Sequence, residues 1–139
     1  MRLPLSEFKS EYKEIRPKII VSKEKANKHT AINENNCLAR QLKIDGYVIT
    51  EDIPKCDYLV LNDDNDNRTA YFIELKSDDM KHAIKQIENT VDKLKKDLTG
   101  YDKNLRIVYS GQVNSGTIMA WKKKNKNAVA KHKEYTEYI

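Results

Sequence analysis

The stretch Tyr71-Phe72-Ile73-Glu74-Leu75-Lys76 decides the fold of this chain, together with the apolar run at residues 57–61 that precedes it. Both runs have the length and the apolar and aromatic content that predict β-strands. The segment between them, residues 62–67, contains only Asn and Asp, which is typical of a turn, so the two runs are expected to form an antiparallel hairpin. Such a hairpin would bring Asp57 and Glu74 side by side. Lys76 would share a face with Glu74, because alternate residues of a strand point the same way.

A carboxylate pair with a nearby lysine predicts a Mg²⁺ site suited to phosphodiester hydrolysis, in which Mn²⁺ would be a substitute. The predicted ligands are Asp57, Glu74 and the carbonyl group of Leu75, because Mg²⁺ prefers oxygen ligands and keeps several waters. A cation held there would neutralise charge that develops on the phosphate. Lys76 would orient or deprotonate the attacking water. The alternative is that Glu74 and Lys76 are solvated residues on an exposed strand face.

The segments around this hairpin predict an α/β arrangement. Residues 42–50 alternate around Gly46 and predict a strand or hairpin bent at the glycine. Apolar residues from Met80 to Leu98 recur on one helical stripe, after Ser77 or Asp78 as the cap. Residues 105–109 predict a further strand, which a right-handed crossover would place parallel to one strand of the hairpin.

The two ends of the chain give weaker signals. Leu5, Phe8, Tyr12 and Ile15 recur at helical spacing and predict a short helix before Pro17. Residues 18–36 fit either a second helix or an ordered loop. Residues 118–121 predict an edge strand, and residues 127–139 have helical character. We therefore expect one α/β domain with a mixed central sheet of about four strands flanked by helices. It would comprise an N-terminal helical region (1–41), a core (about 42–109) and a basic C-terminal region (110–139).

Length and composition favour a single soluble domain. A chain of 139 residues is long enough for one core, and homodimerisation would be the natural way to enlarge it. No stretch of about 20 apolar residues is present, and Met1-Arg2-Leu3-Pro4 lacks the apolar centre of a signal peptide, so we expect a cytoplasmic protein with no membrane partner. Cys37 and Cys56 are expected to be reduced and buried, and the three histidines show no zinc-type spacing.

The charge is divided unevenly along the chain. Residues 1–44 carry a net charge of +5, residues 45–90 carry −6, and residues 91–139 carry +6. Basic flanks around an acidic centre predict a polyanionic partner such as DNA. Trp121 would stack on a base, Lys122, Lys123 and Lys124 would contact phosphates, and Arg106 would clamp a phosphate. The alternatives are a core tryptophan, a surface arginine and lysines that only maintain solubility.

The order and spacing of Asp57 and Glu74-Leu75-Lys76 resemble the PD-(D/E)XK nuclease superfamily, although Pro54 stands three positions before Asp57 and not directly before it. The resemblance covers residues 42–109, about half of the chain. It implies a restriction-endonuclease-like core (α-β-β-β-α-β) and Mg²⁺-dependent hydrolysis of DNA. It also implies a role near the site for Gln86 on the helix after the lysine strand. An early acidic residue would come from the N-terminal region, with Glu34 as the first candidate and Glu11 and Glu14 behind it.

These observations predict a small Mg²⁺-dependent endonuclease that acts on DNA, with branched or repair-type DNA as a suitable substrate. Two other classes remain open. The first is a catalytically silent nuclease-fold module that docks on a protein partner, such as a phage or mobile-element inhibitor. The second is a nucleic-acid-binding protein without catalysis, whose affinity would depend on salt.

Overall fold

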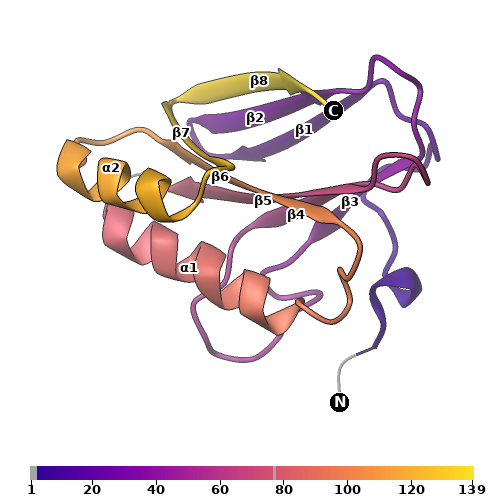
Figure 1. Cartoon of the computed structure of the whole chain (residues 1–139), viewed down its shortest axis with the longest axis horizontal. Coiled ribbons are helices and arrows are strands. Elements are labelled where there is room, and N and C mark those ends of the chain that lie inside the picture. The colour runs from indigo at the N-terminus through magenta and orange to yellow at the C-terminus, as the bar shows by residue number, and fades with distance from the viewer. Residues whose placement is uncertain (1–2, 77) are drawn as a thin grey trace.

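The computed structural model describes residues 3–76 and 78–139, which form one α/β unit with two β-sheets and two α-helices (Figure 1). The larger sheet has the strand order β3-β4-β5-β6-β7, and the smaller sheet has the order β1-β2-β8. The strands are β1 (Ile19–Glu24), β2 (Asn27–Ile32), β3 (Ala39–Lys43), β4 (Tyr58–Asn62), β5 (Thr69–Lys76), β6 (Asp102–Tyr109), β7 (Ala128–His132) and β8 (Glu134–Tyr138). The helices are α1 (Met80–Lys93), α2 (Ser115–Lys124) and a 3₁₀ turn at Leu5–Glu7.

The predicted hairpin is confirmed. Strands β4 and β5 pair antiparallel, with Tyr58 opposite Ile73 and Asn62 opposite Thr69. Strand β6 follows α1 and pairs with β5 in parallel, as the crossover argument predicted. Strand β5 therefore has a neighbour on each edge, and seven of its eight residues are buried.

The long amphipathic helix is also confirmed, with a different cap. The side chain of Asp79 accepts a hydrogen bond of 3.2 Å from the backbone N–H of His82, so Asp79 caps α1. Ser77, one of the two predicted caps, lies outside the described residues. The helix ends at Lys93, but Leu94 and Leu98 stay buried in the turns that follow, so the apolar stripe outlasts the helix.

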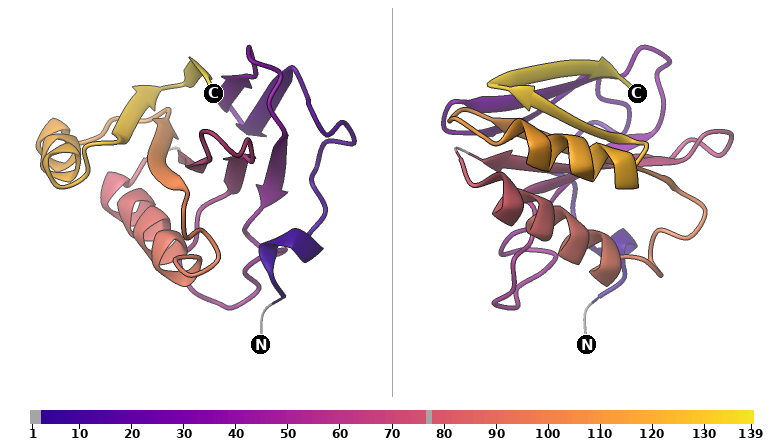
Figure 2. Two further views of the ribbon diagram at one scale, coloured as in Figure 1. Left: turned by 45° about the vertical axis from the view of Figure 1, so that its right-hand side comes forward. Right: turned by 60° about the vertical axis from the view of Figure 1, so that its left-hand side comes forward.

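The molecule has three layers: the small sheet, the large sheet and the helices (Figures 1 and 2). Strand β5 alternates between the two interfaces. One set of its side chains packs with the small sheet, and the other packs with α1. The first interface includes Tyr71, Ile73, Leu75, Val60, Val108, Ile20 and Ala31. The second includes Ala70, Phe72, Leu59, Leu61, Ile107, Ala83 and Ile87. Each fully buried side chain of this size contributes about 1.5–3 kcal/mol, so both interfaces stabilise the sheet.

The described part of the N-terminal region, residues 3–41, contains the 3₁₀ turn but no α-helix, which corrects the prediction of a helical region. Backbone hydrogen bonds run from Glu11 N–H to the Gln41 carbonyl (2.8 Å) and from Ala39 N–H to the Ile15 carbonyl (3.1 Å). The extended chain thus covers the free edge of β3, and pairing an edge strand outweighs a weak helical periodicity. Residues 19–32 form the β1–β2 hairpin, where the sequence left a helix or a loop open.

Both predictions for the C-terminal region are wrong. Residues 118–121 lie within α2, whose first turn is capped by Asn114, and residues 128–138 form β7 and β8. Lys133 separates these strands with a φ of 66° and directs them into different sheets. Strand β7 pairs in parallel with β6, and β8 pairs in parallel with β2. The large sheet therefore has five strands, not about four, and the second sheet was not predicted.

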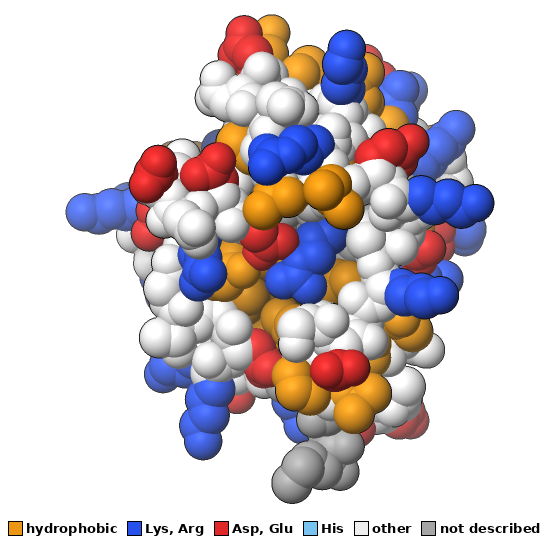
Figure 3. Space-filling model, turned by 90° about the vertical axis from the view of Figure 1, so that its right-hand side faces the viewer, with side chains coloured by type: hydrophobic (Ala, Val, Ile, Leu, Met, Phe, Trp, Pro, Cys, Tyr) orange, Lys and Arg blue, Asp and Glu red, His pale blue; other side chains and the backbone are white. Residues whose placement is uncertain are grey.

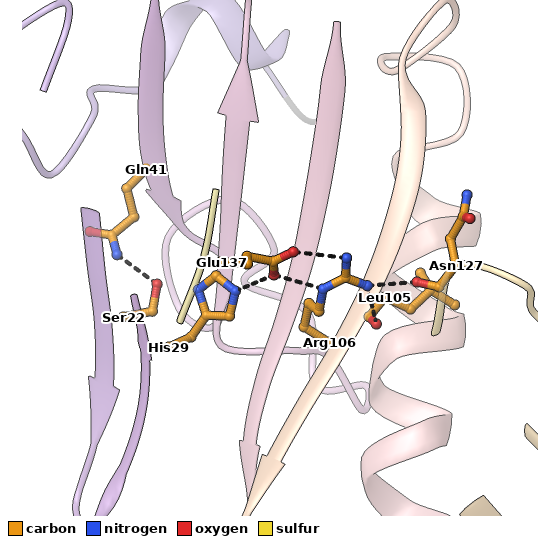
Figure 4. A network of polar contacts seen from close by, with 7 residues as sticks. All are labelled: Ser22, His29, Gln41, Leu105, Arg106, Asn127 and Glu137. Carbon is orange, nitrogen blue, oxygen red and sulfur yellow. Dashed lines mark hydrogen bonds and ion pairs between the residues drawn. The ribbon is translucent and has the colours of Figure 1, made fainter. Parts of the chain in front are cut away.

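Glu137 of β8 joins the small sheet to the large one (Figure 4). Its carboxylate accepts hydrogen bonds from Arg106 Nε (2.7 Å) and Nη2 (2.9 Å), and it lies 2.7 Å from His29 Nε2. The remaining Arg106 donor, Nη1, binds the carbonyl groups of Leu105 and Asn127. The histidine bond and the guanidinium group hold the pKa of Glu137 below its usual value, against the effect of burial. This bidentate pair fixes the C-terminal strand to the centre of the large sheet.

The end of the molecule that carries the β4–β5 loop has a mixed surface (Figure 3). Hydrophobic side chains and charges of both signs surround a hollow there. This end has a cleft of about 320 Å³, lined in part by Ile15, Leu38 and Arg40. Arg40 Nε donates a hydrogen bond of 2.7 Å to Asp63, so the charged side chains at this end are partly paired.

Cys37 and Cys56 are free and buried, as predicted. Burial raises the pKa of the Cys56 thiol far above its usual value, so it stays protonated. Within the described parts of the chain, neither helix is long and apolar enough to cross a membrane.

Candidate active site

One cleft of about 380 Å³ brings together Asp57, Glu74, Leu75, Lys76 and Gln86. It lies at the end of the large sheet where β5 ends and α1 begins (Figure 1). These five residues are the predicted ligands, the predicted lysine and the predicted helix residue. The other wall of the cleft is the β1–β2 turn, at residues 24–27.

Asp57 is fixed by hydrogen bonds to the neighbouring strand. It stands directly before β4, one step beyond the Tyr58–Ile73 pair, which places it opposite Glu74 in the ladder. Its backbone N–H donates to the Ile73 carbonyl (3.1 Å), and its Oδ2 accepts from the Leu75 N–H (2.9 Å). Both ends of the residue are therefore held by β5, which orients the carboxylate into the cleft.

Helix α1 holds the segment that leads into Asp57. Asn89 donates to the Pro54 carbonyl (3.1 Å), and Gln86 Nε2 donates to the Lys55 carbonyl (3.0 Å). The hydroxyl oxygen of Thr90 accepts from the Cys56 N–H at 2.9 Å. Three side chains on one face of α1 thus bind consecutive backbone groups, so the helix fixes the chain that leads into Asp57.

Both acidic side chains have raised pKa values, and burial is the main cause for each. Glu74 is 2% exposed, and burial together with the Asp57 charge raises the pKa of Glu74 to about 9, while Lys76 acts in the opposite direction. Burial raises the pKa of Asp57 to about 6, against the Leu75 N–H, which lowers it, and with help from Glu24 and Asp45. At neutral pH the pair therefore holds about one proton, because two carboxylates in one buried site do not both ionise readily.

Lys76 ends β5 on the same strand face as Glu74 and is half-buried. Its carbonyl group accepts hydrogen bonds from Asn27 Nδ2 (3.1 Å) and from the Ser110 N–H (3.3 Å). The backbone at this position is therefore tied both to β2 of the small sheet and to the chain after β6. The lysine is fixed where it can act on a group bound beside Glu74.

Three side-chain oxygens in this cleft are buried and, among the described residues, have no hydrogen-bond partner: Glu74 Oε1, Gln86 Oε1 and Asn27 Oδ1. The amide oxygens of Gln86 and Asn27 are acceptors, and so is Glu74 Oε1 when the carboxyl group is ionised; a buried acceptor without a donor costs about 1–3 kcal/mol. A hydrated divalent cation supplies both positive charge and water donors, so this set of oxygens fits it.

Few side chains in this cleft could coordinate a metal ion. Within residues 3–76 and 78–139, no three His, Cys, Asp or Glu side chains converge on one metal position. A cation here would be held by Asp57, Glu74 and the carbonyl group of Leu75, with water completing its shell. Mg²⁺ and Mn²⁺ accept such a site, whereas structural zinc requires four Cys or His ligands.

Sequence reasoning missed Glu24 and Asn27, which come from the β1–β2 turn and line the cleft. Glu24 ends β1, and its charge helps to raise the pKa of Asp57. The predicted early acid, Glu34, is instead exposed in the loop after β2, at the far end of that strand from the cleft. Only a weak sequence pattern indicates this turn. A hairpin is consistent with apolar residues 19–21 followed by the polar run Lys23-Glu24-Lys25, but the run contains no turn glycine.

Glu11 and Glu14, the other early acids considered, are exposed on the segment that covers β3 and do not line this cleft.

The structure corrects two of the predicted nucleic-acid contacts. Arg106 is 7% exposed and bound by Glu137, so its guanidinium group is not free to clamp a phosphate. Trp121 is 3% exposed within the main core, so its ring cannot stack on a base. Lys122, Lys123 and Lys124 are exposed, but they form the last turn of α2, which begins near the cleft and runs away from it.

Lys25, in the β1–β2 turn, is a basic residue that lines the cleft beside Lys76. The backbone of Lys133 lies near this end of the molecule, because its N–H donates to the Tyr109 carbonyl and its carbonyl accepts from the Lys28 N–H at 3.0 Å. Tyr109 directly precedes Ser110, which lines the cleft. Lys25 therefore supplies positive charge at the cleft, where the C-terminal lysine run was expected to do so.

Comparisons with protein families, with curated proteins and with solved structures found no match to this chain.

Proposed function

We propose that this protein is a Mg²⁺-dependent endonuclease that hydrolyses phosphodiester bonds in DNA, built on a restriction-endonuclease-like core. The succession β3-β4-β5-α1-β6 supports this core, because three antiparallel strands are followed by a helix and a strand parallel to the last of them. The leading helix of that arrangement is replaced by the extended segment and the β1–β2 hairpin.

The observation that carries the proposal is the pair of buried Glu74 and partly buried Asp57, with Lys76, in one cleft. Two carboxylates held together away from water destabilise the folded state unless a proton or a cation compensates them. The Leu75 N–H donates to the Asp57 carboxylate, and the Asp57 N–H donates to the Ile73 carbonyl, so Asp57 is held opposite Glu74. The fold therefore keeps the two carboxyl groups together in a position where a bound cation would stabilise them. Perturbed acids of this kind gather at functional sites.

In the proposed reaction, Asp57, Glu74 and the carbonyl of Leu75 hold the cation, which supplies Lewis-acid stabilisation of the phosphate charge. Lys76 orients the attacking water and stabilises the negative charge that develops at phosphorus. Basic residues at the mouth, such as Lys25, hold the flanking phosphates. We expect the shape of the DNA to decide the substrate more than base contacts would, as for branched or repair-type DNA.

The test is cleavage of supercoiled plasmid and of a four-way junction by the purified protein with Mg²⁺. Asp57→Ala and Lys76→Ala should each reduce the rate by at least about 100-fold while circular dichroism stays unchanged. Asp66→Ala and Lys124→Ala are the matched controls, because both residues are exposed and lie outside the cleft. Cleavage that persists in both site variants would contradict the assignment.

A catalytically silent binding module is the second candidate. It is favoured by the ligand set, since only two of the acids in the described chain converge closely enough to share one cation. Calorimetric titration of the protein with Mn²⁺ separates the two functions. Binding with a site count of one per chain favours the nuclease, and no heat at millimolar Mn²⁺ favours the module.

A further inference from the structure

We infer that Asn27 is a positioning residue of this site, which fixes Lys76 through its amide nitrogen and binds a hydrated divalent cation through its amide oxygen. The inference rests on the proposed function, because it assigns a new residue to the same cleft. It concerns a residue of the small sheet, outside the segment that carries the predicted motif.

Asn27 begins β2 and is 3% exposed, in the cleft beside Glu74 and Lys76. A carboxamide so deeply buried would normally use both its donor and its acceptor. Nδ2 donates to the Lys76 carbonyl at 3.1 Å, whereas Oδ1 is buried and, in the part of the chain that is described, has no donor. The side chain therefore satisfies its nitrogen on the protein and leaves its oxygen for something that enters the cleft.

Gln86 shows the same arrangement from the opposite wall. Its Nε2 donates to the Lys55 carbonyl at 3.0 Å, and its Oε1 is buried without a donor among the described residues. Gln86 thus binds the backbone two residues before Asp57, and Asn27 binds the backbone of Lys76. Side chains from two different layers thus hold the backbone before β4 and at the end of β5, and both line the same cleft.

The chemistry of the oxygens selects the ligand. Gln86 Oε1 and Asn27 Oδ1 are amide oxygens that accept hydrogen bonds, and Glu74 Oε1 accepts them once its proton is displaced, so the group that satisfies them must donate in several directions and favour a carboxylate. A hydrated divalent cation does both, because its waters are strong donors and its charge matches the acidic pair. A phosphate or a carboxylate ligand would instead place acceptors against acceptors.

Outer partners of this kind set both the affinity of a metal site and the orientation of its reactive groups. Their removal typically reduces metal affinity or activity by about 10–100-fold. Asn27→Ala should therefore lower the affinity for Mn²⁺ by about 10-fold, and it should reduce kcat while leaving the KM for DNA nearly unchanged. The KM for DNA should stay unchanged because Asn27 is buried within the cleft. The phosphates are expected to bind instead to basic residues at the mouth of the cleft.

Asn33 provides a matched control near the far end of the same strand. It is 5% exposed and binds the carbonyl groups of Pro17 and Cys37, while its own oxygen accepts from the Cys37 N–H. Asn33→Ala should destabilise the protein by about 1–3 kcal/mol and leave Mn²⁺ affinity within twofold of wild type, measured well below the melting temperature.

Calorimetry and electron paramagnetic resonance with Mn²⁺ on the full chain, combined with single-turnover cleavage, test the inference. Weakened Mn²⁺ binding in Asn27→Ala alone supports it. Unchanged binding in Asn27→Ala, or equal weakening in Asn33→Ala, overturns it even if wild type cleaves DNA. If wild type binds Mn²⁺ but does not cleave, the proposed function fails while the Asn27 comparison still decides the inference. A wild-type chain that binds no Mn²⁺ overturns both.

Discussion

Asp57 and Glu74 occupy opposite positions on adjacent antiparallel strands, and the charge of Asp57 helps burial to raise the pKa of Glu74. Neither residue is placed by a flexible loop. Asp57 is bonded to β5 through its backbone and through its side chain, and Glu74 belongs to the most buried strand of the large sheet. The fold therefore holds two acidic groups close together where β5 meets the β1–β2 turn. Ionisation of both groups is unfavourable there unless a cation is bound.

Glu74→Gln should stabilise the protein at alkaline pH in the absence of divalent cations. The pKa of Glu74 is about 9 in the folded state against an ordinary 4.5, so the folded state binds more protons than the unfolded state between these values. The free energy of unfolding therefore falls as pH rises from 4.5 toward 9, and the amide removes this loss. We expect a gain of about 1–3 kcal/mol at pH 8 and little gain at pH 4.

Thermal denaturation across this pH range, with chelator present, measures the effect. Glu34→Gln is the control, because Glu34 is exposed and does not line the cleft. An equal gain at pH 4 and pH 8 would show that ionisation of Glu74 is not the cause.

Mg²⁺ should raise the melting temperature and release protons at neutral pH. The acidic pair holds about one proton near pH 7, which the cation would displace. At a Mg²⁺ concentration ten times the dissociation constant, the gain is about 1.4 kcal/mol. Titration in two buffers of different ionisation enthalpy counts the protons. The prediction fails if Asp57→Asn gains as much from Mg²⁺ as wild type does.

Glu24→Gln should weaken Mg²⁺ binding by about 10-fold and lower the pKa of Asp57. Glu24 lines the cleft and its charge is one of the causes that raise the pKa of Asp57. The resonances of Asp57 followed by NMR titration report the pKa directly. Glu34→Gln, the acid that the sequence favoured, should change neither quantity, and the reverse result would restore Glu34 as the early acid.

Basic residues at the mouth of the cleft should carry the DNA affinity. Lys25 and Lys133 have positive φ values of 53° and 66°, so Asn is the suitable neutral replacement because it tolerates this conformation. The double variant Lys25→Asn/Lys133→Asn should weaken binding and reduce the slope of log affinity against log salt by about 0.9 for each lost phosphate contact. Fluorescence anisotropy at several salt concentrations measures both.

The comparison is a variant with Lys122, Lys123 and Lys124 all replaced by Ala, because these lysines lie on the last turn of α2, away from the cleft. A larger change in the salt slope for this triple variant would move the DNA path to the other end of the molecule.

Glu137→Ala should destabilise the fold by about 3 kcal/mol, because it leaves Arg106 buried without its counter-charge. The pKa of Glu137 is held below its usual value, so the stability that it contributes is present above that value and is lost as pH falls through the folded pKa. Chemical denaturation measures the loss, with Glu134→Ala on the same strand as the exposed control. Equal losses in the two variants would contradict a specific role for the pair.

The central part of the chain was predictable because its signals are local. An Asn and Asp turn between two apolar runs determines a hairpin, and hairpin pairing alone brings Asp57 beside Glu74 and puts Lys76 on the same face. The stripe of apolar residues after Met80 determines α1 in the same way, since burial of one face stabilises a helix of that length. Gln86 was predicted from the resemblance to the nuclease superfamily, and its place on α1 brings it to the cleft.

Tertiary structure decided the ends of the chain and the second wall of the site. The helical spacing of Leu5, Phe8 and Tyr12 did not form a helix, because that segment pairs with the free edge of β3. Residues 128–138 form strands because neighbours distant in sequence, β6 and β2, provide edges for them. Glu24 and Asn27 reach the cleft only through the packing of one sheet on another. The sequence by itself thus determined the acidic pair and its lysine, while long-range strand pairing determined which residues surround them.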